Sequence, residues 1–355
     1  MWYYISDTYK LEHFHYYLYR QPKGCGMEII MENFEELLTL CRGKNVYIQT
    51  HNFPDPDAIG SAFGLQCLLA EFDQPSTLCY AGRIDKLNTS KMIKAFNIQI
   101  YPYEQLDMQP DDPIICVDSQ KNGGNITDFI GDEIACIDHH PTFVPVDYAY
   151  KDVRIVGACA TLIAEYYASL KKVPSSDVAT ALLYGLKTDT LQFSRGVTQQ
   201  DIEAFGFLHP LCDKEKLTRL EKNNMEFKDL KAYGAAIENI QLYDMVGISR
   251  IPFSCPDALI ATLADFILSL EEVDVAILYS QREDGIKFSV RSERSDIHAG
   301  ELIRQALEGL GDGGGHAVMA GGLIGKENVS KLGCDLEYAI RDLFLKFCNP
   351  ESRYI

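Results

Sequence analysis

The sequence has no apolar run long enough to span a membrane. Such a span needs roughly 18 consecutive apolar residues, and the best candidate, residues 258–270, is shorter and contains Asp265. The first 26 residues are rich in aromatic and histidine side chains but lack the apolar core of a signal peptide. Both absences argue against a membrane protein, and we expect a cytoplasmic one.

Paired cysteines and an excess of basic residues are also missing. The eleven cysteines stand singly, mostly among apolar residues, without a CxxC pair, which favours reduced thiols over a disulfide framework. Lysine and arginine number 33 against 51 acidic residues, for a net charge of −18. A groove for long nucleic acid normally needs a basic face, so the composition argues against one. A short phosphorylated substrate remains compatible with it, because bound divalent cations would reverse the local field.

Short apolar runs alternate with helical periods beyond residue 26. We expect buried strands at residues 45–50, 76–80, 114–117 and 134–137, with helices between them. This alternation predicts an α/β fold in which a parallel sheet has helices on both faces. A chain of 355 residues is too long for one typical core, so a smaller α/β domain should follow a helical linker. The predicted parts are an N-terminal extension at 1–26, a first domain at 27–196, a linker at 197–235 and a second domain at 236–349.

Acidic and imidazole side chains follow three of the predicted strands. Ligands of open parallel sheets bind at the carboxyl ends of the strands, so these side chains should meet at one edge. A further acid, Asp189, ends an apolar helix that covers residues 178–186. The residues after the three strands are His51, Asp55, Asp57, Asp118, Asp138, His139 and His140.

A single aspartate after a strand has a simple explanation, since aspartate is common in turns and helix caps. Asp57, for example, could cap a helix that starts at Ala58. Several acids at one edge would instead repel each other unless cations neutralised them. Oxygen and nitrogen donors without thiolates suit Mn²⁺ or Mg²⁺, and four carboxylates would balance two such ions. Paired divalent ions commonly cleave phosphoesters with water.

The second domain contains a glycine-rich segment at residues 309–322. Consecutive glycines can present backbone N–H groups to an anion, and His316 would add a donor; a flexible turn is the alternative. Upstream, Arg291 ends a predicted strand, where its planar guanidinium would suit a phosphate; a salt bridge is the alternative. Between residues 282 and 304, five basic residues are matched by five acidic residues. No basic stripe for a long backbone is present here, which favours a small substrate with one or two phosphates.

Four segments, in this order, resemble the motifs of the DHH phosphoesterase superfamily. They are HNFPDPDAIGS at 51–61, CVDSQ at 116–120, IDHHP at 137–141 and GLKTDT at 185–190. The GGGH sequence at 313–316, with Arg291 and Ser292 upstream, resembles the associated C-terminal domain of nanoRNases and pAp phosphatases. The resemblance covers residues 27–349. Lys187 and Asp312 depart from the usual family pattern.

The resemblance implies two bound divalent ions, with Mn²⁺ expected and Mg²⁺ or Co²⁺ as alternatives. His51, Asp55 and Asp118 would hold one ion. The second would be held by Asp57, Asp118, His139 and Asp189. Pro54 and Pro56 should push Phe53 and Asp55 into extended conformations. Asp55 and Asp57 could then face different ions.

The resemblance also implies roles beside the metals. With Asp118 as the shared ligand, Asp138 would orient His139 or its neighbours. His140 would contact the scissile phosphate and help protonate the leaving oxygen. The second domain would hold the substrate across a cleft between the domains. Its predicted contacts are Arg291, Ser292, Gly313, Gly314, Gly315 and His316.

The predicted function is a metal-dependent phosphoesterase that hydrolyses short oligoribonucleotides (nanoRNA, pApA) and pAp through two-metal activation of water. The alternatives are a cyclic-dinucleotide hydrolase, a pyrophosphate or polyphosphate hydrolase, and a catalytically silent nucleotide-binding protein. A short nucleotide is the expected partner, without long nucleic acid or membrane, and a homodimer is compatible with the sequence.

Overall fold

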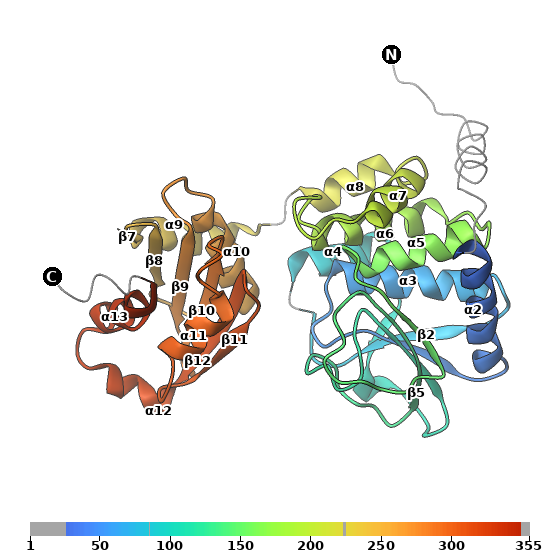
Figure 1. Cartoon of the computed structure of the whole chain (residues 1–355), viewed down its shortest axis with the longest axis horizontal. Helices are drawn as coiled ribbons and strands as arrows, with labels where there is room; N and C mark the ends of the chain where they lie inside the picture. Colours follow the sequence, from blue (N-terminus) through green and yellow to red (C-terminus); the bar gives the residue numbers. More distant parts are fainter. Residues whose placement is uncertain (1–25, 85, 223–224, 349–355) are drawn as a thin grey trace, which may run out of the picture. The chain divides into compact units, whose positions relative to one another are not determined.

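The computed structural model describes residues 26–84, 86–222 and 225–348, and the chain divides into two compact units between residues 224 and 225 (Figure 1). The predicted extension at residues 1–26 lies outside the described residues except for Gly26, where helix α2 (Gly26–Cys41) begins. Each unit has its own sheet and its own hydrophobic cores. The prediction of two α/β domains is confirmed.

The first unit is built on a six-stranded, fully parallel sheet in the order β3-β2-β1-β4-β5-β6. The order reverses its direction between β1 and β4, which makes this pair the topological switch point where open α/β sheets bind ligands. The sequence predicted four of these strands and missed the two short edge strands, β3 and β6. The strands are β1 (Val46–Gln49), β2 (Ser76–Tyr80), β3 (Ile100–Pro102), β4 (Pro113–Val117), β5 (Asp132–Asp138) and β6 (Tyr150–Val153).

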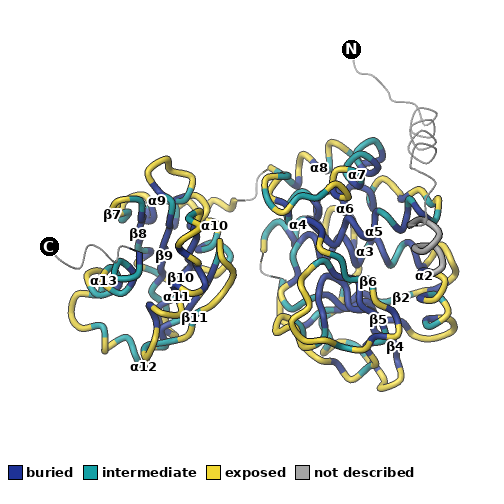
Figure 2. The backbone as a smooth tube through the Cα atoms, viewed as in Figure 1, coloured by how far each residue is buried: buried dark blue, intermediate teal, exposed yellow. Residues whose placement is uncertain are grey.

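Helices cover one face of this sheet in two layers. α3 packs against α5 and α6, and all three are buried along most of their length (Figure 2). α7 and α8 pack against α6 from outside, which explains why α6 is apolar all round. The helices are α3 (Pro56–Ala70), α4 (Leu87–Ala95), α5 (Cys159–Ser169), α6 (Ser176–Asp189), α7 (Gln199–Leu208) and α8 (Lys214–Glu221).

The opposite face of the sheet is covered differently from the prediction. The connections from β3 to β4, from β4 to β5 and from β5 to β6 contain no α-helix, only the 3₁₀ helix η1 (Tyr103–Gln105) and irregular segments. These connections bury Phe129, which stacks on Tyr103 with ring centroids 4.0 Å apart, and they cover Ile114 and Cys116 of β4. The same connections carry the residues that follow β4 and β5, so they shape the sheet's carboxyl edge.

The predicted linker at residues 197–235 belongs largely to the first unit. Leu208 on α7 and Leu217 and Leu220 on α8 are buried in that unit's main core. Most of the charged residues that suggested a linker lie on the outer faces of short amphipathic helices, which need few apolar positions; Asp201 is a buried exception. The second unit begins before the predicted residue 236, with η2 (Phe227–Asp229) and α9 (Leu230–Glu238).

The second unit has a six-stranded mixed sheet in the order β11-β12-β10-β9-β8-β7, in which only β8 and β9 run parallel. One core, with α11 and α13, lies on one face of the sheet, and a separate core contains α9 and α10. The strands are β7 (Gln241–Tyr243), β8 (Val246–Ile251), β9 (Val275–Gln281), β10 (Gly285–Ser292), β11 (Asp312–Gly315) and β12 (Met319–Gly325). The remaining helices are α10 (Asp257–Leu268), α11 (Ala299–Ala306), α12 (Lys326–Val329), η3 (Ser330–Leu332) and α13 (Leu336–Cys348).

Across the described ranges, no helix combines the length and the apolar character needed to cross a bilayer. The best candidate in the sequence falls on α10, where Leu263 and Ala264 are buried in the core and Asp265 is exposed.

Candidate metal centre

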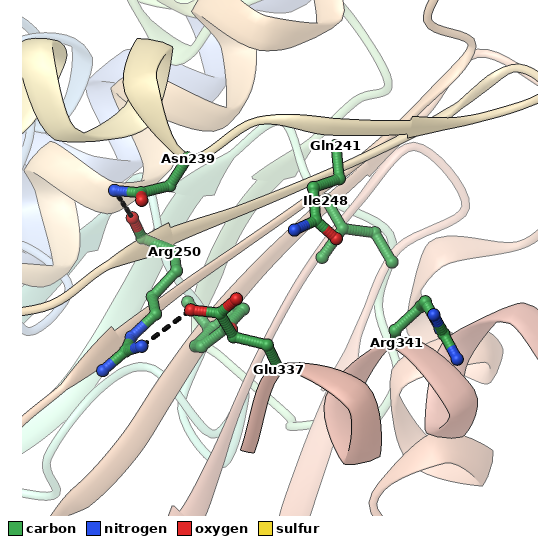
Figure 3. A pocket seen from close by; sticks show the side chains of 7 residues that line it. Asn239, Gln241, Ile248, Arg250, Glu337 and Arg341 are labelled. Atoms are coloured by element: carbon green, nitrogen blue, oxygen red, sulfur yellow. Dashed lines mark hydrogen bonds and ion pairs between the residues drawn. The ribbon is translucent and has the colours of Figure 1, made fainter. Parts of the chain in front are cut away.

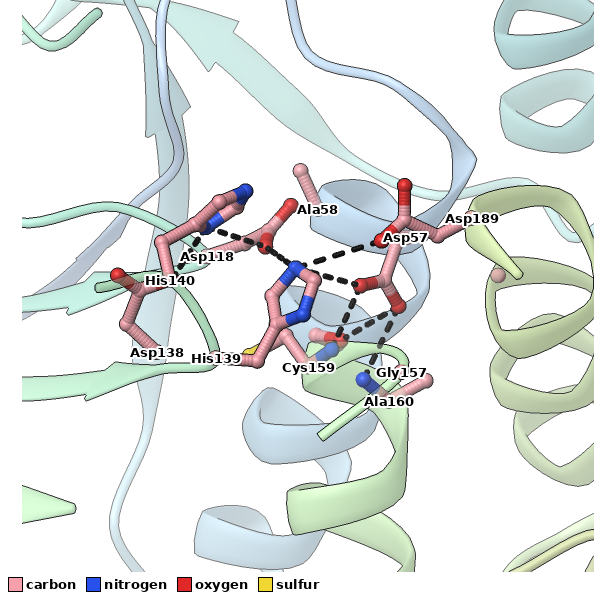
Figure 4. A network of polar contacts seen from close by, with 12 residues as sticks. Asp57, Ala58, Asp118, Asp138, His139, His140, Gly157, Cys159, Ala160 and Asp189 are labelled. Carbon is pink, nitrogen blue, oxygen red and sulfur yellow. Dashed lines mark hydrogen bonds and ion pairs between the residues drawn. The ribbon is translucent and has the colours of Figure 1, made fainter. Parts of the chain in front are cut away.

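Side chains from all four motifs converge at the carboxyl edge of the parallel sheet (Figure 4). His139 Nε2 lies 3.3 Å from Asp118 Oδ1 and 3.4 Å from Asp189 Oδ2. His51 Nε2 lies 3.7 Å from Asp118 Oδ2. Asp118 therefore stands between two imidazoles that come from the ends of β1 and β5, at the switch point of the sheet.

These side chains form overlapping groups whose ligand atoms lie within 4.8 Å of one another. One group is His51, Asp55 and Asp118, which is the set predicted for the first ion. A second group contains Asp57, His139 and Asp189, which are three of the four residues predicted for the other ion. Asp118 is the fourth predicted residue, and its Oδ1 atom lies 3.3 Å from His139 Nε2. Oxygen and imidazole donors in this arrangement suit a divalent cation.

The loop after β1 positions the first acids. Asp55 is extended, with φ −105° and ψ −177°, and is the N-cap of α3, because its carboxylate accepts from the backbone N–H groups of Asp57 and Ala58. Pro56 follows at the first helical position, which suits its fixed φ. The extended conformation predicted for Asp55 is thus confirmed. The prediction is wrong for Phe53, whose φ of 58° is left-handed.

Asp57 is not the cap of α3, which was the simple alternative for this acid. Its carboxylate is almost fully buried and accepts from the backbone N–H groups of Cys159, at 2.7 Å, and Ala160, at 3.0 Å. Both donors lie at the N-terminus of α5, where the helix dipole favours a negative charge. Asp57 is therefore oriented by a helix that is about 100 residues later in the chain.

Asp118 has the features expected of a ligand to a cation. Its Oδ1 atom is buried and has no hydrogen-bond donor within the described part of the chain. Its backbone has a φ of 58°, a conformation that costs free energy for a residue other than glycine and that clusters at functional sites. A buried carboxylate oxygen without a hydrogen bond is unfavourable unless a cation lies beside it, either a metal ion or the protonated ring of His139. The donor set therefore fits a bound divalent ion.

The two histidines after β5 have different partners. His139 Nδ1 donates to the Val156 carbonyl at 3.0 Å, so its Nε2 faces the carboxylates. His140 Nδ1 lies 2.9 Å from Asp138 Oδ1, and Gln120 donates to the other oxygen of Asp138 at 2.7 Å. Asp138 therefore orients His140 and not His139. Hydrogen bonding of this kind sets the tautomer and the ring orientation of a functional histidine.

The carboxylates of the cluster repel each other when no cation is present. Burial, with the nearby charges of Asp118 and Asp189, raises the pKa of Asp57 well above its ordinary value. Burial and the charge of Asp118 raise the pKa of Asp189 to about 6. Burial opposes ionisation of Asp55 too, but contact with His51 outweighs it and lowers the pKa of Asp55.

The imidazoles respond in the opposite direction. Burial acts to lower the pKa of His51, but the Asp55 and Asp118 carboxylates outweigh burial and raise this pKa to about 9. Burial is likewise outweighed at His139, where Asp118, Asp57 and Asp189 raise the pKa to about 11. In the absence of a bound cation, both rings are therefore expected to hold a proton near neutral pH.

Metal binding should therefore become tighter as the pH rises from 6 toward 9. Below a pH of about 6 a metal must displace a proton from Asp189, and below about 9 it must displace one from His51. Competition between Mn²⁺ binding to the protein and to a chelating indicator, measured at constant ionic strength, should show a rising affinity over this range. An affinity that is constant or falls with pH would contradict this assignment of the proton-bearing groups.

The predicted substrate contacts of the second unit lie on β10 and β11. Gly313, Gly314 and Gly315 form edge strand β11, paired with β12, where the sequence suggested a loop. His316 follows this strand and is exposed. An edge strand keeps one side of its backbone unpaired, so the glycines can still present N–H groups.

Arg291 and Ser292 are engaged within the second unit. The Arg291 guanidinium donates to Asp265 of α10, to the Ser289 hydroxyl and to the Val290 carbonyl. The salt-bridge alternative thus describes Arg291 as it stands, and its contact with a phosphate stays a prediction. Ser292 is buried, and its hydroxyl accepts from the backbone N–H of Arg294.

A small hollow in the second unit lies elsewhere, between the strands β7 to β9 and the start of α13 (Figure 3). Arg250 lies in it and donates to Glu337 at 2.7 Å and to Gln281 at 2.6 Å. None of the predicted substrate contacts lines this hollow. Its lining residues are Asn239, Gln241, Ile248, Arg250, Tyr279, Glu337 and Arg341.

Comparison with known families matches both units. A model described as the DHH family, N-terminal domain, matches residues 45–186, and the DHHA1 domain matches residues 244–341. The first match contains five of the six candidate metal ligands and ends shortly before Asp189. Both units of the chain are therefore of a known domain type. The chain belongs to the DHH phosphoesterase superfamily, with a DHH domain followed by a DHHA1 domain.

Curated relatives differ in their named activities. The uncharacterized protein MJ1633 of Methanocaldococcus jannaschii is 29% identical over 276 residues, which cover 77% of this chain and 56% of the relative. The cyclic-di-AMP phosphodiesterase GdpP of Bacillus subtilis is 26% identical, over 89% of this chain and 50% of its own. The probable bifunctional oligoribonuclease and PAP phosphatase NrnA of Streptococcus mutans is 25% identical, over 78% of this chain and 88% of its own. The chain thus spans about half the length of the first two relatives.

Among solved structures, an exopolyphosphatase-related protein from Bacteroides fragilis superimposes with a TM-score of 0.70 at 19% identity. The match covers 91% of this chain and 96% of the other. It supports the two-unit fold.

Sequence reasoning missed several residues that shape the site. Gln120 holds Asp138, and the backbone of residues 156–160 holds Asp57 and His139. Arg195 donates to the Asp189 carbonyl at 2.7 Å. Gln120 lies within the second motif, so its position could have drawn attention to it. Backbone donors leave no signal in side-chain identity, and nothing in the sequence distinguished residues 156–160.

Proposed function

We propose that the chain is a Mn²⁺-dependent phosphodiesterase and phosphatase that acts on short nucleotides, namely di- to oligoribonucleotides such as pApA, and pAp. The observation that carries the proposal is the placement of Asp118. Its carboxylate lies within 4 Å of both His51 Nε2 and His139 Nε2, and one of its oxygens is buried without a donor. A carboxylate in this position suits a ligand shared by two cations.

Two divalent ions held here would act as Lewis acids on a phosphoryl oxygen and generate a nucleophile from water near neutral pH. The chain's own residues would orient these ions and the substrate. His51 and His139 each use Nδ1 to bond a backbone carbonyl, so that Nε2 of both rings is turned toward the acids. This arrangement holds the imidazoles in a single orientation before an ion binds.

His140 is the proposed proton donor to the leaving oxygen. Burial acts to lower the pKa of His140, but the hydrogen bond with Asp138 outweighs it and raises this pKa, which favours the protonated ring that a general acid needs. Its side chain is 47% exposed, unlike that of His139 at 10%, so a substrate can reach it. The hydrogen bond from Gln120 holds Asp138 in place beneath the ring.

Two exposed aromatic rings support a nucleotide over a substrate without bases. Phe53, between His51 and Asp55, is 53% exposed, and Phe143, three residues after His140, is 77% exposed. Phe53 packs against the backbone of Gly82, where an added Cβ would come within 3.2 Å of the ring. Exposed aromatic side chains beside a phosphate-processing site are suited to stack on nucleobases.

We expect Phe53→Ala and Phe143→Ala to weaken the use of pApA while sparing pyrophosphate. Loss of one stacked base costs about 1–3 kcal/mol, so the KM for pApA should rise about 5- to 150-fold. Ile130→Ala is the matched control, because Ile130 is as exposed as Phe53 and precedes β5 at the opposite edge of the sheet. Equal losses on pApA and on any pyrophosphate activity would show that the rings do not bind bases.

The proposal is tested with metal-free protein reloaded with Mn²⁺ and assayed on pApA, pAp, cyclic di-AMP, pyrophosphate and polyphosphate. We expect the highest kcat/KM for pApA or pAp, and its loss in Asp189→Ala. If wild type and Asp189→Ala behave alike on all five substrates, the catalytic proposal is wrong. Preference for cyclic di-AMP would instead favour the activity named for the GdpP relative.

A further inference from the structure

Asp201 is a buried acid outside the four motifs. It lies in the first turn of α7 and is fully buried. Its Oδ2 atom accepts from the backbone N–H and the hydroxyl of Thr198, each at 2.7 Å, which completes a capping box. Its Oδ1 atom accepts from the Thr161 hydroxyl at 2.6 Å. A buried carboxylate is costly, so hydrogen bonds of this number are needed to keep it.

One further bond leads from Asp201 toward the metal centre. The backbone N–H of Gly157 donates to Asp201 Oδ2 at 2.8 Å. The contact is so close that a Cβ on Gly157 would lie 2.7 Å from the same oxygen. Only glycine allows the backbone to approach in this way. Asp201 thereby ties α7 to the segment of residues 156–160, which we call the α5 entry segment.

The α5 entry segment orients two candidate metal ligands through its backbone (Figure 4). The Val156 carbonyl accepts from His139 Nδ1, and the N–H groups of Cys159 and Ala160 donate to the two oxygens of Asp57. No side chain of the segment is used in these bonds. The position of both ligands therefore depends on where the backbone of the segment lies.

The same segment also touches the chain next to the third ligand. A Cβ on Gly157 would lie 2.7 Å from the methyl carbon of Thr190, which directly follows Asp189. Asp57, His139 and Asp189 form one of the candidate metal groups. Asp57 and His139 thus bond to the segment that Asp201 holds, and Asp189 directly precedes a residue that packs against it.

We propose that Asp201 is a positioning residue for one of the two metal ions, the ion held by Asp57, His139 and Asp189, through the backbone of the α5 entry segment. This inference rests on the proposed two-metal function. It is selective, because the other group is supported differently. His51 Nδ1 bonds the Asn52 carbonyl, and Asp55 caps α3, so the described hydrogen bonds that orient these two side chains do not involve residues 156–160.

The test is Asp201→Asn, which preserves the shape of the side chain but replaces one acceptor oxygen by an NH₂ group. That NH₂ group would face N–H and O–H donors and could not accept a hydrogen bond from them. Wild type should bind two Mn²⁺ ions in a calorimetric titration. The variant should bind one ion with unchanged affinity and the other at least about 10-fold more weakly, as found when groups that orient metal ligands are removed. The electron paramagnetic resonance spectrum at two equivalents of Mn²⁺ should change from that of a coupled pair toward that of isolated ions.

Two further variants separate positioning from general destabilisation. Gly157→Ala disrupts the same hydrogen bond from the side of the donor, because the added Cβ would crowd the Asp201 carboxylate. It should weaken binding of the same ion, and it provides the test if Asp201→Asn does not fold. Asp213→Ala removes the N-cap of α8, where the carboxylate accepts from Glu215 and Lys216, and should lower the melting temperature without altering either site.

The proposal is overturned if folded Asp201→Asn or Gly157→Ala binds both ions as wild type does, or if Asp213→Ala weakens the same ion equally. A wild type that binds fewer than two ions would contradict the proposed function itself. Retention of two ions by wild type and by the Asp201 variant would contradict only the positioning role.

Discussion

Replacing Asp118 by asparagine is expected to lower kcat on pApA by more than about 10³-fold, since it removes the carboxylate that both predicted metal ions would share. Loss of a single preorganised electrostatic contact to a developing charge already costs about 10²–10³-fold. Asparagine is nearly isosteric and tolerates the left-handed backbone that residue 118 adopts, with a φ of 58°. The loss should therefore reflect the missing charge and not a misfolded loop.

Asp112→Asn is the matched control for this variant. Asp112 is a buried acid at the opposite end of β4, where its carboxylate accepts from the backbone N–H of Gln109. This control should keep wild-type kinetics. An Asp118→Asn enzyme that retained a tenth of wild-type kcat would show that Asp118 does not hold a catalytic ion.

Metal removal should have the second large effect, on stability as well as on activity. Burial, together with the charges of Asp118 and Asp189, raises the pKa of Asp57, a sign that ionised carboxylates here destabilise the metal-free fold near neutral pH. At 100 times its dissociation constant, each bound ion stabilises by about 2.7 kcal/mol. For a domain of this size each kcal/mol raises the melting temperature by about 2–4 °C. Two ions should thus raise the melting temperature of the first unit by roughly 10–20 °C.

Differential scanning calorimetry of chelator-treated protein, with and without Mn²⁺, measures this shift. Hydrolysis should fall to background on chelation and return with Mn²⁺. Asp118→Asn serves as the comparison, and its shift should be much smaller because each of the two predicted ligand sets loses a carboxylate. A shift of equal size in wild type and in Asp118→Asn would place the stabilising ions away from the cluster.

The sequence was most informative where side chains bind ligands directly. Apolar runs located the central strands, and acids directly after three of these runs indicated a common edge. The structure brings these residues within a few ångströms of one another. Carboxylates and imidazoles have few structural uses in such number, so their residue types carried the signal.

Sequence reasoning was less informative where the backbone or the tertiary context decides. The N–H groups that hold Asp57 belong to a helix distant in the sequence, and no residue type marks them. Asp201 looked like an ordinary acid in a charged linker, because its burial depends on Gly157 and Thr161. The left-handed φ of Phe53 was also unpredictable from the neighbouring Pro54, which favours extended geometry at the residue before it.

The most direct test of the two-metal centre is a crystal structure of the Mn²⁺-loaded protein with anomalous scattering at the manganese absorption edge. We predict two anomalous peaks about 3.5–4 Å apart, with the Asp118 carboxylate between them. His51 and Asp55 should contact one peak, and Asp57, His139 and Asp189 the other. A single peak, or none within this cluster at saturating Mn²⁺, would contradict the two-metal centre.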